Sequence, residues 1–549
     1  MAKYIFVVGG VMSGVGKGIA SASIGKILQA RGLEVTAIKI DPYVNVDAGT
    51  MNPTEHGEVF VLDDGMECDQ DMGNYERFLD RDLTRANYMT TGSIYLSVIE
   101  KERALEYGGK FVSVVPYIPL EVIERIDKAG KKNKAKVIIT EIGGTVGEYE
   151  NLLFLEAVKM LKIKKPRDVV LVLVSYLPLQ GSDTELKTKP TQHAVRALNA
   201  AGLQPDFILA RAKVGIDKKR KEKIAFHCSL MEEDVISAPD IESIYEVPLN
   251  FEKDNLSDKI LKKLNLKPKV REMKEWDAFV ENIEEGGDEI KIGIVGKYFG
   301  TGSFTLADSY ISVIEAIKHA TYFLKKKPVL EWLNAEDYDE DFTPDYRKNL
   351  QRLGDYDGVV VPGGFGSRGV EGKISAIRYL RENKIPFLGL CYGMQLAVIE
   401  SLRKVKGYES AHTTEIEQKT AYPVVDILPE QKKNLSAKHF GASMRLGAYP
   451  ALLKKDTLAY KAYGEENISE RHRHRYEVNP DYIEVLEGKT DIIFSGVSPD
   501  RRLMEIMELP KEKHPFFLGS QFHPELKSRP LRPHPLFLAF MEACVKRQK

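Results

Sequence analysis

Short runs of apolar residues recur along the chain, separated by segments with the spacing of amphipathic helices. In the first half they are YIFVV (4–8), EVTAIKI (34–40), KVIITEI (136–142), VVLVLVSY (169–176) and DFILARA (206–212). In the second half they are KIGIVG (291–296), DGVVVPGG (357–364) and PFLGLC (386–391). Strands that are apolar on both faces and alternate with helices are typical of a parallel sheet covered on both sides. The pattern therefore predicts an α/β fold.

One long segment interrupts this alternation. From about residue 254 to residue 289 the chain is charged and lacks strand-like runs. Trp276 and Phe279 fall on one face of a predicted helix, which a Gly-Gly pair should end. We interpret residues 269–290 as a linker between a first domain, residues 1–268, and a second domain, residues 291–549.

Composition narrows the class of protein. The chain has 549 residues, too many for one compact core, and 43% of them are hydrophobic. The formal net charge of -1 gives no general reason to expect nucleic acid or a membrane surface as a partner. The four cysteines form no CxxC pair, so neither a zinc site nor a disulfide framework is indicated, and a cytoplasmic location fits. The N-terminus reads as a strand rather than a signal peptide, and the apolar stretch 169–179 is too short to span a bilayer.

The segment PFLGLCYGMQLAVIESL (386–402) contains a candidate nucleophile. A strand-like run leads into Gly389-Leu390-Cys391-Tyr392-Gly393, and a helical pattern follows, as in a nucleophile elbow with cysteine in place of serine. Such a turn places the sulfur at a helix N-terminus, where the thiolate is favoured. The alternative is a buried structural cysteine, which the glycines on both sides disfavour.

A base and an oxyanion hole have candidates in the same half. His523 and Glu525, in PFFLGSQFHPELKS (515–528), are two residues apart on a predicted strand and should share a face, so Glu525 can orient the imidazole. The glycine-rich end of the run 357–366 can present a backbone N–H to an oxyanion. Taken singly, each motif could be structural.

In their order, PGGFG, GLCYGMQ and QFHPE resemble the class I glutamine amidotransferases over roughly residues 291–545. The resemblance implies a thioester at Cys391, with His523 as base and Glu525 behind it. It also implies glutamine contacts by Gly364, Tyr392, Gly393, Met394 and Gln395. Tyr392 stands where most members have leucine.

The N-terminal half opens with a candidate phosphate loop. The run VVGGVMSGVGKG (7–18) is a strand that enters glycines and a lysine, and a helix follows, so backbone N–H groups and Lys17 could hold phosphates. The match to GxxxxGK[ST] is imperfect: Gly10 comes one residue early, and Gly18 replaces the hydroxyl that would bind Mg²⁺. The alternative is a glycine-rich turn that binds no nucleotide.

Two carboxylates are candidates for the missing metal ligand. Asp71 lies in an acidic segment before a predicted helix, and Glu141 ends the strand-like run KVIIT. Carboxylates at the C-terminal ends of parallel strands lie where α/β proteins bind ligands, and hard oxygen ligands suit Mg²⁺. For any single acidic residue, a solvated surface position is the alternative.

Longer segments resemble the CTP synthase family from end to end. They are residues 39–65, DMGNYERF (71–78), EIGGTVGEYE (141–150), KTKPTQH (187–193), GGFGSRGVEGK (363–373) and ERHRHRYEVN (470–479). The family implies a P-loop-like, dethiobiotin-synthetase-like amidoligase domain and a glutaminase domain. It implies the ligase reaction that ends de novo CTP synthesis: ATP phosphorylates O4 of UTP, and ammonia from glutamine, or free ammonia, displaces the phosphate.

The same resemblance assigns the remaining site residues by position. It assigns UTP binding to Ser13, Lys187, Thr188, Lys189, Pro190, Thr191, Gln192 and Lys223. It assigns the stretch at which CTP inhibits, by competing with UTP, to Glu148, Tyr149 and Glu150. It assigns ATP binding to Gly14, Val15, Gly16, Lys17, Gly18, Ile19 and Lys39, and contacts on the adenine side to Pro239, Asp240 and Ile241. It assigns Mg²⁺ binding to Asp71 and Glu141, and further glutamine contacts to Glu415 and Arg475. His56 matches the residue that gates the ammonia path. Tyr149 and Pro239 depart from the pattern common in the family.

The family further implies feedback inhibition by CTP, activation by GTP, and a homotetramer that is a dimer without nucleotides. No residue pattern in this chain indicates these properties by itself. An alternative of the same class is a cobyrinate-type diamide synthase, against which KTKPTQ and EIGGTVGEYE argue. A third is a filament-forming scaffold without catalysis. Two basic runs, 217–226 and 470–476, could suggest RNA binding, but we interpret them as a solvated helix face and a largely structural segment.

Overall fold

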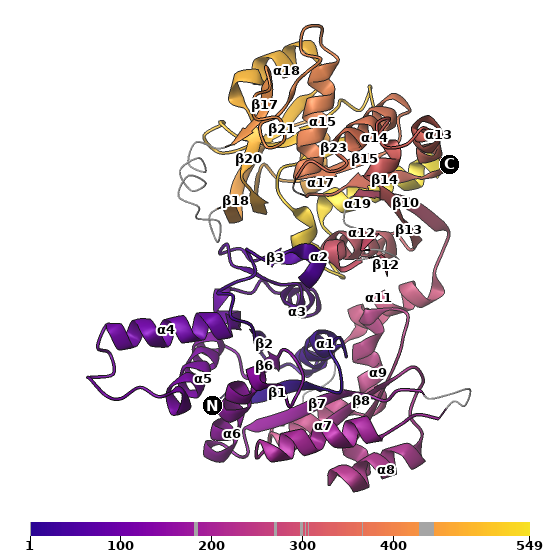
Figure 1. The fold of residues 1–549 in the computed structure, drawn as a ribbon. Coiled ribbons are helices and arrows are strands. Elements are labelled where there is room, and N and C mark those ends of the chain that lie inside the picture. The colour runs from indigo at the N-terminus through magenta and orange to yellow at the C-terminus, as the bar shows by residue number, and fades with distance from the viewer. Residues whose placement is uncertain are drawn as a thin grey trace. The chain divides into compact units, whose positions relative to one another are not determined.

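The computed structural model describes residues 2–179, 185–267, 272–296, 300–301, 304–305, 307–364, 366–427 and 444–548 (Figure 1). The chain divides into two compact units. The first consists of residues 1–48 and 71–280, and the second of residues 49–70 and 281–549. Residues 49–70 therefore pack with the second unit, although the sequence analysis places them in the first domain. The expected linker is in part a helix, α11 (Lys274–Glu285), and residues 268–271 lie outside the described residues.

Among the described residues, the first unit contains a seven-stranded sheet in which every neighbouring pair is parallel. The five runs expected from the sequence each form a strand, as predicted. Two short edge strands were not predicted. In spatial order the strands are β5 (Tyr88–Thr90), β2 (Val35–Asp41), β6 (Val137–Ile142), β1 (Lys3–Gly10), β7 (Val169–Tyr176), β8 (Phe207–Ala212) and β9 (Val235–Pro239).

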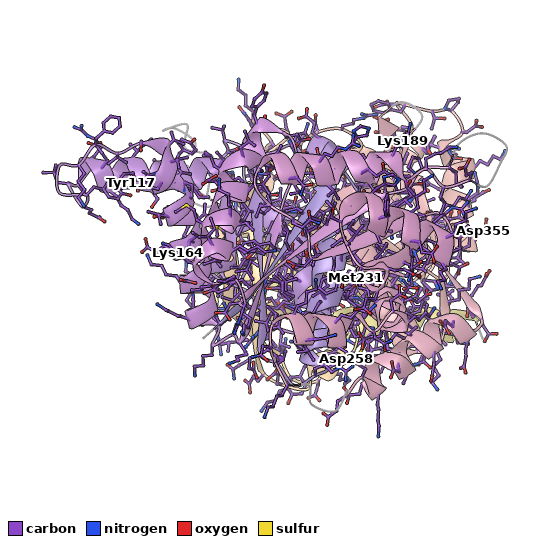
Figure 2. The ribbon with its side chains drawn as sticks, turned by 90° about the horizontal axis from the view of Figure 1, so that it is seen from below. Tyr117, Lys164, Lys189, Met231, Asp258 and Asp355 are labelled. Atoms are coloured by element: carbon purple, nitrogen blue, oxygen red, sulfur yellow. The ribbon has the colours of Figure 1, made fainter. Side chains whose placement is uncertain are left out.

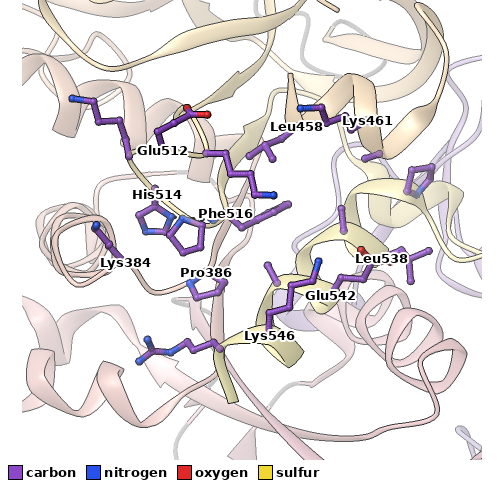
Figure 3. Close-up of a pocket in the computed structure, with 18 residues that line it drawn as sticks. Lys384, Pro386, Leu458, Lys461, Glu512, His514, Phe516, Leu538, Glu542 and Lys546 are labelled. Carbon is purple, nitrogen blue, oxygen red and sulfur yellow. Dashed lines mark hydrogen bonds between the residues drawn. The ribbon is translucent and has the colours of Figure 1, made fainter. Parts of the chain in front are cut away.

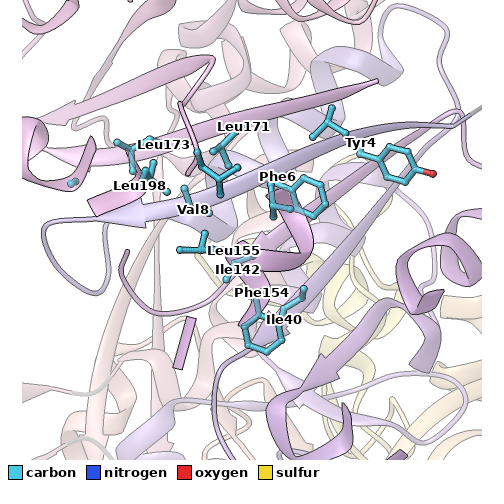
Figure 4. Packing of buried hydrophobic residues seen from close by; sticks show 14 of the residues in the cluster. Tyr4, Phe6, Val8, Ile40, Ile142, Phe154, Leu155, Leu171, Leu173 and Leu198 are labelled. Atoms are coloured by element: carbon cyan, nitrogen blue, oxygen red, sulfur yellow. The ribbon is translucent and has the colours of Figure 1, made fainter. Parts of the chain in front are cut away.

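Helices cover both faces of this sheet. On one face Tyr4, Phe6 and Val8 alternate along β1 and join a core with Leu155 and Leu198 (Figure 4). The helices on this face are α4 (Thr91–Arg103), α5 (Val114–Lys132), α6 (Leu152–Lys164), α7 (Lys189–Ala200) and α8 (Lys218–Cys228); Tyr117, Lys164 and Lys189 mark three of them in Figure 2. On the other face α1 (Lys17–Gln29) packs against α3 (Asp71–Leu79) and α9 (Val247–Lys253), followed by α10 (Leu256–Lys263).

The topology fixes where this unit can bind a ligand. From β1 the chain crosses to β2 on one side, whereas β7 lies on the other side of β1. In open α/β sheets, ligands bind at the carboxyl ends of the strands where the strand order reverses. The loop between β1 and α1 lies at that point.

The second unit contains, among its described residues, a nine-stranded mixed sheet. The strands β13 (Lys327–Asn334), β10 (Glu289–Gly296), β14 (Gly358–Val361), β15 (Phe387–Leu390) and β23 (Phe517–Ser520) are parallel. An antiparallel extension that the sequence did not predict continues the sheet: β22 (Met504–Glu508), β21 (Ile493–Val497), β18 (Arg445–Leu453) and β19 (Asn467–His474).

Helices and three smaller sheets, one of them the pair β11 (Gly300–Thr301) and β12 (Phe304–Thr305), complete the described part of the second unit. The longer helices are α12 (Ile311–Phe323), α14 (Val370–Glu382), α15 (Tyr392–Arg403) and α19 (Pro535–Gln548), and the shorter ones are α13 (Tyr346–Arg352), α17 (Leu458–Tyr463) and α18 (Ile483–Lys489). A three-stranded sheet is formed by β16 (His412–Thr413), β17 (Pro423–Ile427) and β20 (Tyr476–Val478). Residues 49–70 contribute α2 (Pro53–His56) and the hairpin of β3 (Val59–Val61) and β4 (Glu67–Asp69). No helix in the described parts of the chain has the length and apolarity needed to cross a membrane.

Candidate functional site

Cys391 occupies a tight turn between β15 and α15, as the sequence predicts. Its φ of 51° and ψ of -99° are strained values for a residue with a side chain, and strain of this kind is concentrated at functional sites. The turn depends on Gly393, because a Cβ there would lie 2.1 Å from the carbonyl oxygen of Val361. The turn places Cys391 at the N-terminus of α15, with 6% of its surface exposed.

His523 and Glu525 form the expected pair, but on a different element. The sequence predicted a strand, whereas β23 ends at Ser520 and residues Pro524–Lys527 form a 3-10 turn. Pro524 has no N–H for a strand ladder, so the chain leaves the sheet before it. The turn still brings His523 Nδ1 to 2.7 Å from Glu525 Oε1. The other ring nitrogen, Nε2, has no hydrogen-bond partner among the described residues.

The electrostatics of His523 suit a base beside a thiolate. Burial by itself lowers the pKa of His523, but the negative charges of Glu525 and of the Cys391 thiolate outweigh it, so the pKa stands well above its ordinary value. A hydrogen bond of Nδ1–H to Glu525 leaves Nε2 as the atom that exchanges a proton with Cys391.

A cavity of about 80 Å³ connects these groups with the glycine-rich loop after β14. Its lining includes Cys391, His523, Glu525, Gly363 and Gly364. A Cβ on Gly363 would lie 3.2 Å from His523 Cε1 and 3.6 Å from the Cys391 Cβ, so the loop backbone closely approaches both side chains. Phe365 of the same motif lies outside the described residues.

The cavity also has lining residues that the sequence analysis missed. Glu58 and Val59 come from the segment 49–70, and Glu58 accepts hydrogen bonds from the backbone and hydroxyl of Ser312 at the start of α12. Tyr310 and Arg473 line the wall as well. The one signal for Arg473 was its position two residues from Arg475, because residues two apart share a face if the run forms a strand.

The other expected glutamine contacts are not among the residues that line this cavity. Glu415 accepts a hydrogen bond from the N–H of Gly366 at 2.9 Å, and Arg475 is half-buried; neither is among the cavity's lining residues. Tyr392, Gly393, Met394 and Gln395 form the buried first turn of α15. His56, the expected gate, is exposed at the end of α2.

In the first unit the loop between β1 and α1 has the form expected of a phosphate loop. Gly14 and Gly16 have φ values of +72° and +85°, and α1 begins at Lys17. Ser13 is exposed on the loop, whereas Val15 is buried. Lys17 is 8% exposed and donates to the carbonyl oxygen of Gly144 at 2.9 Å. Burial is the main cause of its lowered pKa.

Gly18, where a P-loop carries a hydroxyl, faces a carboxylate instead. A Cβ at Gly18 would lie 1.9 Å from Asp71 Oδ1, so only glycine allows Asp71 to occupy this space. Lys39 donates to Asp71 Oδ2 and, at 3.0 Å, to Glu141 Oε1, and Tyr75 donates to the other oxygen of Glu141. The two predicted metal ligands therefore converge on one ammonium group.

The charges of Lys39, Asp71 and Glu141 determine whether this group of side chains can hold a cation. Burial raises the pKa of Glu141 although Lys39 opposes it, whereas for Asp71 the ammonium outweighs burial and the pKa lies below its ordinary value. No group of three or more His, Cys, Asp or Glu side chains in the described residues could hold a metal ion unaided. Two carboxylates with phosphate oxygens fit the ligand set that Mg²⁺ takes from proteins and nucleotides.

A cavity of about 320 Å³ joins the phosphate loop to the predicted adenine contacts. Its lining includes Gly16 and Ile19 of the loop and helix α1, and Pro239, Asp240 and Ile241 after β9. Leu209 and Phe251 supply apolar walls, and Arg211 reaches Asp240 at 2.8 Å. The fold thus brings together two segments that are more than 200 positions apart in the sequence.

Only some of the residues expected to hold UTP lie on the same element of the fold. Thr188, Thr191 and Gln192 are buried around the first turn of α7, and the Cβ of Ala194 in this helix would lie 2.5 Å from a Cβ on Gly10. Lys187 pairs with Glu185, and Lys189 and Pro190 begin α7. Lys223 is exposed on α8.

The expected CTP-inhibited stretch follows the loop after β6. Glu148 accepts from the N–H of Thr145 at 2.9 Å, beside the Gly144 carbonyl that holds Lys17. Tyr149 is 88% exposed, and Glu150 is exposed too.

A much larger cavity, of about 740 Å³, contains none of the predicted site residues. It is lined by residues of α17, of α19 and of the segment 511–516, and its lining includes Lys384, Lys461 and Lys546 as well as the apolar Phe516 (Figure 3). These lysines are exposed, and no catalytic side chain faces the space. Volume alone therefore does not identify the active site of this unit.

Comparisons with known proteins show which family the chain resembles. The family model "CTP synthase N-terminus" matches residues 3–266, and the model "Glutamine amidotransferase class-I" matches residues 305–543. CTP synthase of Pyrococcus furiosus is 50% identical over 99% of this chain and 98% of its own length. CTP synthase of Methanocaldococcus jannaschii is also 50% identical, over 99% of this chain and 98% of its own.

Among solved structures, the glutaminase domain of Trypanosoma brucei CTPS with bound acivicin is 35% identical. The match covers 47% of this chain and 94% of the Trypanosoma brucei domain, with a TM-score of 0.42. The full-length likeness to the curated relatives identifies the family: the chain belongs to the CTP synthases.

Proposed function

We propose that the protein makes CTP from UTP, ATP and glutamine. The observation that carries this proposal is a 50% identity to CTP synthases over 99% of the chain, in a protein that also has a Cys391–His523–Glu525 site. The cobyrinate-type alternative is set aside, because the matched family model of the N-terminal half is that of CTP synthase.

In the glutaminase half-reaction, the Cys391 sulfur attacks the side-chain amide carbon of glutamine after its proton passes to His523 Nε2. Backbone N–H groups of Gly364 and Tyr392 stabilise the oxyanion. His523 then protonates the leaving nitrogen, which departs as ammonia and leaves a thioester on Cys391. Water activated by His523 hydrolyses the thioester to glutamate, and Glu525 holds the imidazole throughout.

In the synthetase half-reaction, the γ-phosphoryl group of ATP passes to O4 of UTP. Ammonia then attacks C4, and the phosphate leaves to give CTP. The loop residues Gly14–Ile19 hold phosphates, and Lys17 and Lys39 offset charge on the transferred group. Asp71 and Glu141 would hold Mg²⁺, which would supply neutralisation of phosphate charge.

The remaining assignments are part of the same proposal. UTP is bound by Ser13, residues 187–192 and Lys223, and the adenine of ATP by residues 239–241. Glu148 to Glu150 mediate inhibition by CTP, while Glu415 and Arg475 contact glutamine and His56 gates the ammonia path. GTP activates the glutaminase step. The protein forms a homotetramer when it binds nucleotides. It acts in the cytoplasm, where its four free cysteines suit a reducing environment.

The test combines product analysis with two variants. The protein should form CTP from UTP, ATP, Mg²⁺ and either glutamine or ammonia. Cys391→Ala should abolish the glutamine-dependent reaction by at least about a thousandfold and retain the ammonia-dependent one, because only the thioester route is lost. Lys17→Ala should remove both reactions. The control is Cys544→Ala, another buried cysteine of the second unit.

The outcomes separate the claims. No CTP from either nitrogen source would reject the proposed function. Loss of both reactions in a folded Cys391→Ala variant would instead mean that the sulfur is structural or that the two halves are not separable.

A further inference from the structure

Gln521 leaves the sheet beside the nucleophile. β15 and β23 are neighbouring parallel strands, with Leu390 opposite Ser520, and the N–H of Cys391 donates to the Ser520 carbonyl at 2.7 Å. Cys391 and Gln521 are therefore the next residues at the same edge of the sheet. Gln521 is fully buried, and its side-chain Nε2 lies 3.7 Å from the Cys391 sulfur, within hydrogen-bond range for an N–H donor to sulfur.

A second glutamine fixes which end of the Gln521 amide faces the sulfur. Gln395 Nε2 donates to the Tyr476 carbonyl at 2.8 Å and to Gln521 Oε1 at 3.1 Å. These acceptors use both of its N–H groups. If the Gln521 amide were rotated, two NH₂ groups would face each other and an oxygen would face the sulfur. The network therefore places a donor on Cys391.

The Tyr476 carbonyl, which accepts a hydrogen bond from Gln395, also accepts one from a histidine. His474 Nδ1 donates to it at 3.1 Å, so Nε2 of that ring is the acceptor for His472 Nδ1 at 2.9 Å. Burial is the main cause that lowers the pKa of both imidazoles well below the ordinary value, so both are neutral and these roles are consistent. The backbone N–H of Gln521 donates to the Glu505 carbonyl at 2.8 Å.

We propose that Gln521 is a catalytic residue of the glutaminase reaction, whose amide N–H donates to the Cys391 sulfur and stabilises its thiolate, and that Gln395 is a positioning residue that orients this amide. The proposal rests on the proposed function above.

The hydrogen bond matters because the charge on the sulfur changes during the cycle. An N–H donor binds a thiolate more strongly than a neutral thiol or a thioester. Gln521 thus favours the reactive thiolate and stabilises the same sulfur when it departs from the thioester. No proton leaves the amide, since the thiol proton still passes to His523 Nε2. The side chain of Gln395, with both N–H groups bound within the protein, acts on the sulfur through Gln521.

The test measures how readily the sulfur ionises. In Gln521→Met the side chain keeps its approximate length and loses the donor. In Gln521→Glu the oxygen that accepts from Gln395 is kept, and the donor is replaced by an oxygen. The pH dependence of iodoacetamide alkylation at Cys391, followed by mass spectrometry, should move to higher pH by about one unit in both variants. The kcat for glutamine hydrolysis should fall about ten- to a hundredfold, with a smaller change in KM.

Two further variants complete the design. Gln395→Met should produce a smaller shift in the same direction, because Gln521 keeps its donor but loses its fixed orientation. Gln351→Met, on the exposed surface of α13, is the matched control and should retain the unchanged protein's curve.

The proposal is overturned if either Gln521 variant, folded as judged by circular dichroism and thermal unfolding, keeps the alkylation curve of the unchanged protein. The readout needs no CTP formation. A protein that makes no CTP but shows the shift would therefore reject the proposed function and leave the sulfur contact standing.

Discussion

Single residues decide the chemistry of both units, and Gly18 is the clearest case in the first. The sequence predicts a phosphate loop, one that lacks the hydroxyl usually found after its lysine. In the structure the space beside Gly18 is taken by the Asp71 carboxylate, which Lys39 also holds. The absent side chain is thus a requirement of the site, since any Cβ would displace the carboxylate.

We predict that Gly18→Ala abolishes CTP formation from both glutamine and ammonia while glutamine hydrolysis continues. The new Cβ would lie 1.9 Å from Asp71 Oδ1, and overpacking of this kind costs roughly 1–3 kcal/mol of stability. Assays of both half-reactions and thermal unfolding provide the measurement. Gly215→Ala is the control, because the nearest atom to its Cβ is Ser237 Oγ at 3.8 Å. Normal CTP synthesis in Gly18→Ala would contradict the role given to this contact.

At the scale of elements, contacts between helices and strands hold the glutaminase site in place. Glu371, in the first turn of α14, binds Arg403 at the end of α15 through two hydrogen bonds of 2.7 and 3.0 Å. It also lies 3.5 Å from His412 Nε2 in β16. The helix α15, which follows Cys391, and its neighbours α14 and β16 therefore meet at one carboxylate. Burial raises its pKa, but His412 and Arg403 more than compensate and hold the pKa of Glu371 at about 2.

We predict that Glu371→Gln destabilises the protein more at neutral pH than in acid. A carboxyl whose pKa falls on folding contributes stability above its unfolded value, here 4.5, and loses it as the pH falls toward about 2. Because 47% of the side chain is exposed, solvent screening limits the loss to roughly 1 kcal/mol at pH 7. Urea unfolding at pH 7 and at pH 3 measures it, with the exposed Glu484→Gln as control. A difference that grows in acid would contradict the linkage.

The elements also show where sequence patterns succeed and fail. The five apolar runs of the first unit and the strands before Cys391 were predicted, because strands buried on both faces are apolar throughout. The strand β19, with the sequence NISERHRH, was not. Its charged residues are buried by pairing, as in Arg471 with Asp63, which no alternation of hydrophobic and polar positions can indicate.

At the scale of the whole molecule, the chain passes between the two compact units three times, at residues 48–49, 70–71 and 280–281. The segment 49–70 is fastened within the second unit by Arg471 to Asp63 at 2.5 Å and by Arg473 to Glu67 at 2.9 Å. It brings Glu58 and Val59 to the Cys391 cavity. Covalent continuity then links this cavity to Asp71, the first residue after the segment.

We predict that Asp63→Ala loosens this segment and weakens the coupling between the two reactions. Arg471 is fully buried, so the loss of its partner should cost roughly 1–3 kcal/mol. Hydrogen exchange of residues 59–69 should accelerate, and less CTP should form per glutamine hydrolysed. Glu55→Ala, exposed in the same segment, serves as control. Unchanged exchange in Asp63→Ala would show that the ion pair does not hold the segment.

The sequence by itself determined the elements whose signals are local: the parallel strands, the two glycine-rich turns, and the identities of Cys391, His523, Lys17, Asp71 and Glu141 as candidates. These follow from periodicity and turn chemistry, which act over a few residues. Only the tertiary structure decided that His523 lies in a turn and not on a strand, that Asp71 fills the space of a missing hydroxyl, and that residues 49–70 pack with the second unit. Each depends on contacts between segments far apart along the chain, which no local pattern encodes.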